Sequence, residues 1–492
     1  MSAMELAAAV RTRELSPVQV VDAHIARIQA VNRPLNAVVA DRFAAAREEA
    51  RAAEALLMRT SPADLPPLLG VPCTVKEFVA VAGQPHTAGI VARRHVRATE
   101  DATVVRRLKE AGAIVLGSTN APEGGLWHET SNRVYGRTSN PWDLHRTPGG
   151  SSGGEGAILA AGGAPFGIGS DTGGSIRMPA AFCGIAGHKP TGGLVPTTGH
   201  YPTPPVDQLA ALVLGPMARR ATDLWPLLRI IAGDDGQDAQ IRYRLQGEPA
   251  EVDWSRVRVV ELPESRSPVR PEMRAAVHKA GMALVERGAE RVQMDLPQLR
   301  RAFDAWVALL SMGPSTLDDL VSDGAGTRPW LQLLRFAMGR SRHTGGVLVL
   351  LLLERLLDRA PTDLGPLLEL AGSLGQELDD ALGPHGVLLH PPFPRTAPRH
   401  RGMALRRPWD VGCTTVFNVT ESPVTVVPVD VDGKGLPIGV QIAAARGNDA
   451  LTIAAGEVLE EAFGGWRRPV EPRFGPALPM GLRLTRHRAP MR

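Results

Sequence analysis

The sequence GSDTGGSIRMP at residues 169–179, together with GGSSGGEG at residues 149–156, decides what this chain of 492 residues can be. Both stretches are rich in Gly and Ser. They enclose a predicted helix from Gly154 to Ala161 and a predicted strand from Pro165 to Ile168. Glycine-rich backbone inside a large enzyme usually marks tight turns or close approach of the chain to a ligand. The two stretches are therefore the first candidates for a functional site.

Helical and strand patterns alternate on both sides of this centre. Leu69 to Val75 (LGVPCTV) is typical of a strand, and it delivers Lys76 at its end. Asp101 is a predicted N-cap for a helix that ends at Gly112, before a strand from Ala113 to Leu116. The other predicted helices are Pro17 to Ala30, Asp41 to Met58, a Leu-rich region from Thr327 to Pro384, and a last helix that Asn448-Asp449 caps and that ends at Ala462. Later strands are predicted at Val387 to His390, Val424 to Val431 and Ile438 to Ala443. This order predicts the α/β class, as one large domain with a central mixed β-sheet and helices on both of its faces.

The charge distribution separates a tail from the rest of the chain. The chain carries a net charge of +4. Residues 467–492 hold seven arginines and one acid, a net of +6, so the rest of the chain is close to −2. Aromatic residues make up only 4%, too few for a platform on which nucleic-acid bases stack. We therefore expect no nucleic-acid partner, a domain over residues 1–466 and a Pro/Arg-rich tail over 467–492.

The cysteines and the N-terminus indicate a cytoplasmic protein. The three cysteines are odd in number, widely spaced and set in apolar stretches, which argues against disulfides and favours buried, inert thiols. The first residues, MSAMELAAAVRTREL, lack the apolar core of a signal peptide. The most apolar run, Gly346 to Leu353, is far shorter than the roughly 20 residues that a membrane span needs.

Lys76 and the serines suggest acyl transfer. A serine hydroxyl is a weak nucleophile until a neighbouring base takes its proton. Lysine can be that base only when its amine is neutral, and burial at the end of an apolar strand favours the neutral form. Glu77 would oppose this if its carboxylate came near, and we expect it to point elsewhere. In the stretch Asp171 to Ser175, two glycines free the backbone to form an anion-binding nest beside Ser175.

These segments resemble the amidase signature family. The matching phrases are GGSSGGEGAILAAG, GIGSDTGGSIRMPAAFCGIAGHKPTGG, the earlier VKE and the late GLPIGVQIAAARGND, and they cover nearly the whole chain. Lys76 lies 75 residues before Ser151, which lies 24 residues before Ser175, like the Lys–Ser–Ser triad of the fatty-acid amide hydrolases in that family. The phrases SIRMPAAFCGIAGHKPTGGLVPTTG and EEAFGGW look closest to the second vertebrate form of those hydrolases.

The resemblance implies a role for each matching residue. Ser175 would be the nucleophile, Ser151 would follow a cis peptide bond and relay the proton, and Lys76 would be the base and later the acid. The resemblance also implies an oxyanion hole, made by the backbone N–H groups of Thr172, Gly173, Gly174 and Ser175. The supporting residues that it implies, which would orient the triad by hydrogen bonds, are Ser152, Asp171 and Arg177. It implies no cofactor and no metal.

Other interpretations of the same residues are weaker. The pattern G149-x-S-x-G153 matches the nucleophile elbow of α/β-hydrolases, but that motif follows a strand, whereas NPWDLHRTP before it is typical of a loop. A Walker-type phosphate loop would need Gly-Lys-Ser/Thr, which does not follow. The histidines considered as metal ligands show no i, i+4 pairing and no carboxylate cluster, so we expect structural or pocket roles for them: His128, His188, His200 and His390.

The substrate is the least constrained property. We expect a neutral amide with a hydrophobic acyl or aryl group, with esters left open. The segment Trp330 to Leu357 is expected to be a core helical hairpin, with an acyl-pocket lining or peripheral membrane contact as alternatives. One departure from the family pattern is Glu421, where glycine is common. Its carboxylate is expected near the pocket or in solvent. A homodimer is left open. Two other classes also stay open: a non-catalytic binding protein descended from an amidase, and a component of a tRNA-dependent amidotransferase.

Overall fold

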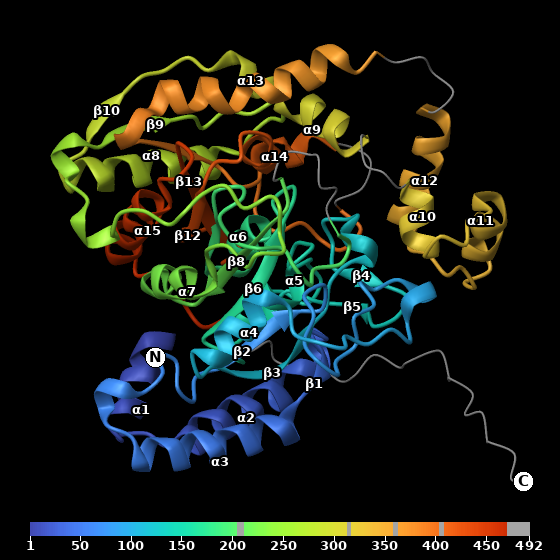
Figure 1. Ribbon diagram of the computed structural model, residues 1–492. Coiled ribbons are helices and arrows are strands. Elements are labelled where there is room, and N and C mark those ends of the chain that lie inside the picture. Colours follow the sequence, from blue (N-terminus) through green and yellow to red (C-terminus); the bar gives the residue numbers. More distant parts are fainter. Residues whose placement is uncertain (204–210, 312–315, 358–362, 403–407, 470–492) are drawn as a thin grey trace, which may run out of the picture.

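A single mixed sheet organises the protein in the computed structural model, which describes residues 1–203, 211–311, 316–357, 363–402 and 408–469. Its eleven strands follow the order β1-β3-β2-β6-β8-β7-β12-β13-β11-β9-β10 (Figure 1). The strands are β1 Val38–Asp41, β2 Pro72–Lys76, β3 Ile114–Thr119, β6 Phe166–Asp171, β7 Ala186–Lys189, β8 Val213–Ala218, β9 Arg258–Glu261, β10 Glu290–Val292, β11 Gly386–His390, β12 Val424–Val431 and β13 Pro437–Ala444. A separate two-stranded ribbon joins β4 Ser131–Asn132 to β5 Gly136–Arg137.

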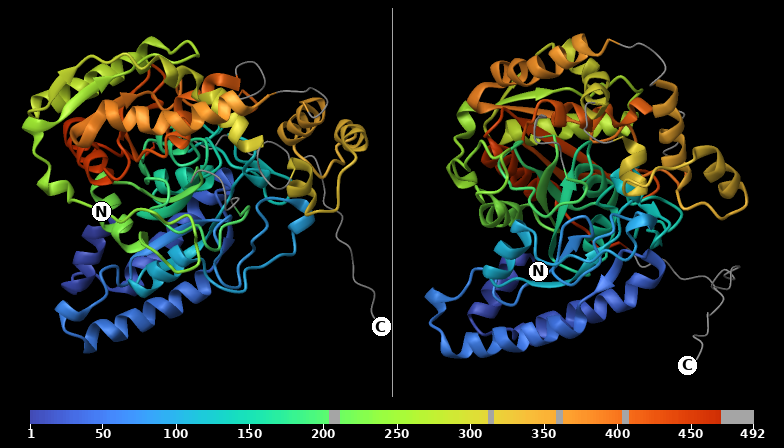
Figure 2. Two further views of the ribbon diagram at one scale, coloured as in Figure 1. Left: turned by 45° about the horizontal axis from the view of Figure 1, so that its top comes forward. Right: turned by 45° about the vertical axis from the view of Figure 1, so that its right-hand side comes forward.

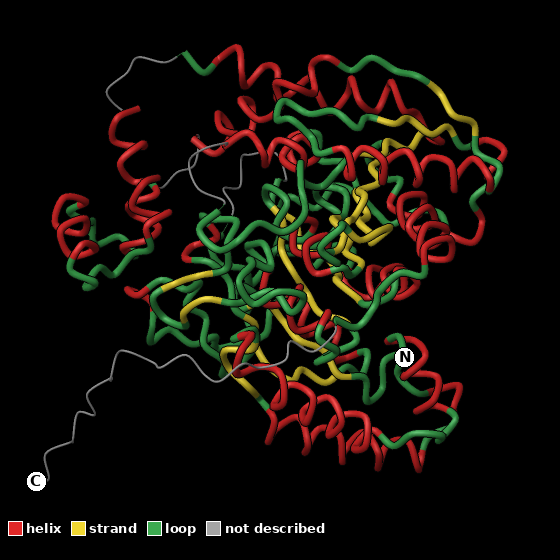
Figure 3. The backbone as a smooth tube through the Cα atoms, turned by 180° about the vertical axis from the view of Figure 1, so that it is seen from behind, coloured by secondary structure: helices red, strands yellow, loops and turns green. Residues whose placement is uncertain are grey.

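Helices lie on both faces of this sheet, as predicted for the α/β class. Seen from behind, the strands run through the middle of the molecule between helical layers (Figure 3). Near the centre of the sheet, Thr425 and Val427 face Gly456 of α15, whereas Gly439, beside Val426, lies against Ala181 of α6. The helices are α1 Ala3–Arg11, α2 Pro17–Leu35, α3 Phe43–Arg59, α4 Thr103–Glu110, α5 Gly153–Ala160, α6 Arg177–Cys183, α7 Leu224–Ile231, α8 Pro271–Glu286, α9 Ala302–Ser311, α10 Leu317–Ser322, α11 Pro329–Ala337, α12 Gly345–Leu357, α13 Gly365–Leu382, α14 Gly412–Val419 and α15 Asp449–Phe463.

The catalytic candidates converge because neighbouring strands are parallel. Strand β2 pairs in parallel with both β3 and β6, with Cys73 opposite Phe166 and Val75 opposite Ile168. The carboxyl ends of parallel neighbours meet at one edge of a sheet, which is where open α/β sheets place their ligands. The end of β2 carries Lys76, and the end of β6 carries Asp171.

Most predicted elements form, with shifted ends. Helix α2 continues to Leu35 rather than Ala30, because Asn36 in the left-handed conformation ends it. The prediction of Asp101 as an N-cap is wrong. Helix α4 begins after Ala102, while Asp101 accepts a hydrogen bond from the Ala82 N–H at 2.8 Å and pairs with Lys109. Asn448 does precede α15, but its side chain makes no capping bond.

The segment from Trp330 to Leu357 is not a hairpin of the main core. Helices α10, α11 and α12 form a lobe beside the body of the protein (Figure 2), with a small apolar cluster of its own around Val347, Leu348 and Leu351. Within the described ranges, no helix combines the length and the apolarity needed to cross a bilayer. Of the Pro/Arg-rich tail, residues 470–492 lie outside the described residues.

Candidate active site

Lys76 is fully buried and faces three oxygen atoms. Its Nζ lies 2.5 Å from Ser151 Oγ, 2.8 Å from Ser170 Oγ and 3.5 Å from the Ser170 carbonyl oxygen. Burial lowers the pKa of Lys76 to about 7, while the negative charge of Asp171, and that of Glu155 in the minority of molecules in which it is ionised, opposes this shift. Since an ordinary lysine titrates near 10.4, the fold makes about half of Lys76 neutral at pH 7.

The neighbouring carboxylates do not hold Lys76 in its charged form. As predicted, Glu77 points elsewhere, and its carboxylate accepts the Thr87 N–H at 2.6 Å and the Tyr135 hydroxyl at 2.9 Å. Glu155 of α5 accepts from Thr74 Oγ1 at 2.6 Å and from Thr119 Oγ1 at 2.9 Å. Burial raises the pKa of Glu155 to about 8, so this group is mostly an uncharged acid at neutral pH.

Ser151 and Ser152 occupy the turn before α5. The Gly150–Ser151 peptide bond is cis, as the resemblance implied, and loop rather than strand precedes it. The Ser152 N–H donates to the Ser175 carbonyl at 3.1 Å. Its hydroxyl accepts the Ser170 N–H at 3.3 Å and donates to the Ser170 carbonyl at 3.2 Å. Ser152 therefore connects the turn that carries Ser151 both to the end of β6 and to the turn that carries Ser175.

Ser175 lies beside a turn with several uncommitted backbone donors. Its side chain is nearly buried, and its hydroxyl makes no hydrogen bond with another described residue. The N–H of Gly174, predicted as an oxyanion donor, instead donates to Asp171 Oδ1 at 2.8 Å. The N–H groups of Thr172, Gly173 and Ser175 make no hydrogen bond within the described part of the chain. Three donors next to one hydroxyl remain available to an anion.

Both glycines of this turn are required by their surroundings. Gly174 has a φ of +108°, and a Cβ there would lie 2.3 Å from Thr414 Oγ1. A Cβ at Gly173 would lie 2.8 Å from the Trp306 ring. The Trp306 indole also donates to the Thr172 carbonyl at 2.8 Å, which turns that peptide's oxygen away from the site.

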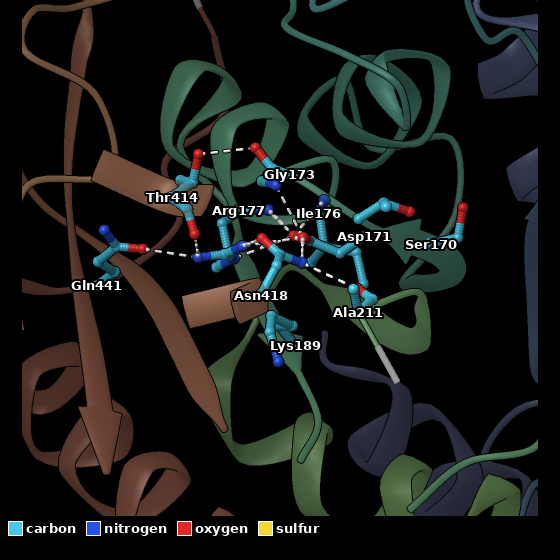
Figure 4. Close-up of polar contacts among 12 residues, drawn as sticks. Ser170, Asp171, Gly173, Ile176, Arg177, Lys189, Ala211, Thr414, Asn418 and Gln441 are labelled. Carbon is cyan, nitrogen blue, oxygen red and sulfur yellow. Dashed lines mark hydrogen bonds and ion pairs between the residues drawn. The ribbon is translucent and has the colours of Figure 1, made fainter. Parts of the chain in front are cut away.

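A buried ion pair holds the other side of the turn (Figure 4). The Asp171 carboxylate accepts from Arg177 Nε at 3.0 Å and from Asn418 Nδ2 at 2.9 Å. Arg177 also donates to Asn418 Oδ1 at 2.6 Å and to the Thr414 carbonyl at 2.8 Å. Burial alone would raise the pKa of Asp171, but the Arg177 guanidinium and these hydrogen bonds hold it well below its usual range. Asp171 therefore remains ionised and fixes the turn through the Gly174 and Ile176 N–H groups.

Sequence reasoning missed several residues that complete the site. Asn418, Thr414 and Trp306 lie more than 130 positions from the residues they contact, and nothing in their local sequence marks them. No sequence pattern indicates the hydrogen bond between Ser170 and His200, although both residues lie in or near the glycine-rich region. A second buried lysine, Lys189, also has its pKa lowered to about 7 by burial, but it donates only to carbonyl oxygens and so has no hydroxyl to deprotonate.

Glu421 corrects a prediction. Its side chain neither faces solvent nor lies free beside a pocket: it is 2% exposed and pairs with Arg242 at 2.5 Å and Arg446 at 3.6 Å. Its backbone φ of +55° is the left-handed conformation that glycine adopts most easily. This conformation accounts for the glycine of the family pattern at this position. Here two arginines neutralise the carboxylate.

Two of the candidate histidines and the three cysteines take structural positions. His188 lies between Thr425 and Asp449, and His390 donates to the Leu262 carbonyl. The cysteines are buried and unpaired, as predicted: Cys73, Cys183 and Cys413. Across the residues that the structure describes, no group of three His, Cys, Asp or Glu side chains is arranged to hold a metal ion.

Known proteins share both the sequence and the fold. The family model described as Amidase matches residues 19–453. Fatty-acid amide hydrolase 2-A of Danio rerio is 40% identical over 488 residues, covering 95% of this chain and 90% of its own length. A glutamyl-tRNA(Gln) amidotransferase component of Roseiflexus castenholzii is 31% identical, covering 91% of this chain and 92% of its own length. The solved peptide amidase of Stenotrophomonas maltophilia superposes with a TM-score of 0.76 at 25% identity, covering 96% and 98%. The chain therefore belongs to the amidase signature family, and it is an amide hydrolase.

Proposed function

We propose that this protein cleaves carboxylic amides through an acyl-enzyme on Ser175, with Ser151 as proton relay and Lys76 as base. The observation that carries the proposal is the contact between a fully buried lysine and the Ser151 hydroxyl, 2.5 Å away. A buried, half-neutral amine has one chemical advantage over a solvated one, because its lone pair is available at neutral pH. The nearly buried Ser175 beside free N–H donors supports the assignment of the nucleophile.

In the acylation step, Ser175 Oγ attacks the amide carbonyl carbon. Its proton passes to Ser151 Oγ while the Ser151 proton passes to Lys76 Nζ. The negative oxygen of the tetrahedral intermediate accepts from the N–H groups of Thr172, Gly173 and Ser175, and the Gly174 N–H stays on Asp171. When the intermediate collapses, the carbon–nitrogen bond breaks. The leaving nitrogen takes a proton from Ser151, which Lys76 replenishes, and an ester to Ser175 remains.

In the deacylation step, water replaces the amine. The Lys76–Ser151 pair takes a proton from water as it attacks the ester carbonyl. Ser175 then leaves as an alkoxide that regains its proton from Ser151, and the carboxylic acid is released. The Ser151 and Ser175 hydroxyls are not hydrogen-bonded to each other before substrate binds. In unliganded enzymes such catalytic hydrogen bonds are often long and tighten when the substrate binds.

We propose a neutral amide with a hydrophobic acyl or aryl group as the substrate class. The 40% identity to a fatty-acid amide hydrolase supports this choice. So does the pairing of Glu421, because its carboxylate is neutralised by two arginines and does not present a free charge to a substrate. Turnover of small polar amides alone, in a panel of acyl and aryl amides, would overturn the substrate class without touching the mechanism.

The alternative of an amidotransferase component predicts a different experimental result. The relative of that kind is 31% identical, against 40% for the amide hydrolase. Such a component uses the same triad but works with partner proteins. Steady hydrolysis of amides by the purified chain alone would argue against this alternative, and hydrolysis that depends on added partners would support it.

Labelling of the nucleophile tests the mechanism directly. The purified chain is treated with a fluorophosphonate probe, and the labelled peptide is identified by mass spectrometry. We expect one label on the peptide that contains Ser175, absent in Ser175→Ala. The matched control is Ser267→Ala, because Ser267 is fully buried and its hydroxyl has no hydrogen-bond partner among the described residues. Labelling of another peptide in the wild type would refute Ser175 as the nucleophile.

We also propose that the lobe of α10–α12 contacts a lipid surface. On α11, Trp330 is 73% exposed and Leu334 is 58% exposed, with Met338 just beyond the helix at 53%. Two exposed arginines, Arg328 and Arg340, flank α11 in the sequence, which suits anionic headgroups. Flotation with vesicles that contain anionic lipid should carry the wild type and lose the Trp330→Ser/Leu334→Ser variant. Equal flotation of both, or no flotation of the wild type, would contradict this.

A further inference from the structure

Lys76 has a second hydroxyl neighbour that the mechanism above leaves unused. Ser170 Oγ lies 2.8 Å from Lys76 Nζ and 3.0 Å from Nε2 of His200. On its other side, His200 Nδ1 lies 2.8 Å from the carbonyl oxygen of Pro202. Ser170 and His200 are both buried. A continuous chain of polar contacts therefore runs from a backbone carbonyl to the amine that we assign as the base.

The direction of each hydrogen bond in this chain follows from chemistry. A carbonyl oxygen only accepts, so Nδ1 of His200 must carry the hydrogen. Burial, and then the charge of Lys76, lowers the pKa of His200 to about 3, so the ring is neutral and Nε2 is an acceptor. The Ser170 hydroxyl must then donate its only hydrogen to Nε2. Toward Lys76 it can only accept.

This polarity decides what remains for Ser151. A neutral amine has two N–H groups and one lone pair. Ser170 offers two acceptors, its hydroxyl oxygen at 2.8 Å and its carbonyl oxygen at 3.5 Å, and no hydrogen for the amine. When both N–H groups point to Ser170, the lone pair is left for the third neighbour, Ser151 Oγ at 2.5 Å.

We propose that His200, acting through Ser170, is a positioning residue that aims the lone pair of Lys76 at the Ser151 hydroxyl. Without an acceptor at His200, the Ser170 hydroxyl could turn and donate to Lys76, and would compete with Ser151 for the same lone pair. His200 hydrogen-bonds the Pro202 carbonyl and Ser170, and so it acts on Lys76 only through Ser170. The inference rests on the proposed function, since it assumes that Lys76 is the base.

Two titratable groups act on His200 from the elements packed against it. They are Lys76 and His86, and the pKa of His86 is itself lowered by burial. The Phe78 ring packs edge-on at 5.9 Å from the His200 ring, and it also lies 4.6 Å from Lys76 Nζ. An aromatic ring can therefore replace His200 with similar shape and no acceptor.

The test compares two pairs of variants. His200→Phe and Ser170→Ala remove the acceptor chain, whereas His200→Gln and Ser170→Thr keep an oxygen in each place. The readouts are the rate of fluorophosphonate labelling at Ser175 from pH 5 to 10, and kcat and KM on one neutral amide. We expect the first pair to lose about 10- to 100-fold in labelling rate and kcat with little change in KM, the range typical of lost orienting partners. The second pair should recover most of this.

The pH profile separates positioning from packing. In His200→Phe the Ser170 hydroxyl can donate to the neutral amine, which stabilises the neutral form of Lys76. The inflection of the profile should therefore move to lower pH while the plateau falls. A merely structural role predicts a different result: all four variants would label equally slowly, the inflection of the pH profile would stay in place, and the melting temperature would fall. That result would overturn the inference.

Two further outcomes are distinguishable. In the first, Lys76→Met abolishes labelling at Ser175, but His200→Phe and Ser170→Ala label at the wild-type rate. This result refutes the inference and leaves the proposed function intact. Labelling that survives Lys76→Met unchanged refutes the proposed function, and the inference falls with it.

Discussion

The pH dependence of Lys76 is the sharpest test of the chemistry. Burial lowers its pKa from 10.5 to about 7. At pH 7 about half of the buried amine is neutral, against roughly one in three thousand for an ordinary lysine, so burial raises the active fraction about 10³-fold. We expect kcat/KM on a non-titrating neutral amide to rise about tenfold per pH unit below 7 and to level off above about 8. Lys76→Met should lose about 10²- to 10⁴-fold and most of this dependence.

The lowered pKa of Lys76 also predicts that Lys76→Met, which should lose activity, should gain stability. Between pH 7 and 10.5 the unfolded chain binds a proton at Lys76 that the folded chain does not, so stability rises with pH across this window. At pH 7 the folded state therefore carries a cost of about 4 kcal/mol, from about 1.36 kcal/mol per unit of pKa shift. Removal of the lysine also loses its hydrogen bonds with Ser151 Oγ and Ser170 Oγ, and these, at about 1 kcal/mol each, offset part of the gain in stability. Lys76→Met should thus be about 2 kcal/mol more stable than the wild type in urea titrations at pH 7.

Lys189 provides the matched control. It is buried, and its pKa is also lowered to about 7, but its amine meets only the carbonyls of Pro190 and Ser422. The profile of Lys189→Met should keep the rise near pH 7. Lys76 would be refuted as the base if Lys76→Met left the pH dependence of kcat/KM unchanged, or if only Lys189→Met abolished that dependence. If kcat/KM of the wild type instead levelled off only above about pH 10, the inference that burial lowers the pKa of Lys76 would be refuted.

Two predictions concern the turn that carries Ser175. Gly174→Ala would place a Cβ 2.3 Å from Thr414 Oγ1 in a backbone with a φ of +108°, so we expect loss of labelling at Ser175. Thr414→Ala should not restore it, because the Thr414 Cβ that alanine keeps would still lie 2.5 Å from the new Cβ. Labelling of Gly174→Ala at the wild-type rate would contradict the steric argument. Arg177→Met leaves Asp171 as a buried unpaired carboxylate and should cost about 3–5 kcal/mol of unfolding free energy. Its stability should recover as pH falls and the unpaired Asp171 becomes protonated. In the wild type the lowered pKa keeps Asp171 ionised across this range, so urea titrations at pH 7 and pH 4.5 should show a recovery in Arg177→Met and no gain through Asp171 in the wild type.

The strands and helices around the site could be predicted from local pattern. The apolar run Leu69–Val75, followed by Lys76, predicted β2 and a buried position for Lys76. A strand whose residues are apolar or small on both faces is typical of a strand that helices cover on both sides of the sheet. Helix ends were predicted less well, since a cap depends on which neighbour reaches it. Asp101 has the composition of an N-cap, but its carboxylate is taken by Ala82 and Lys109.

The sequence by itself determined the parts of the proposed site. The Lys76–Ser151–Ser175 set, the two glycines beside Ser175 and the Asp171–Arg177 pair all lie in short segments whose residue types can be read directly. Only the tertiary structure decided how these parts are held. Asn418, Thr414 and Trp306 reach the turn from distant helices, the Gly174 N–H is claimed by Asp171, and His200 meets Ser170 across 30 residues. The physical reason is that a hydrogen bond or a contact carries no periodicity along the chain. Its partners are chosen by packing of the sheet, and only the folded arrangement shows which donors are used and which remain free.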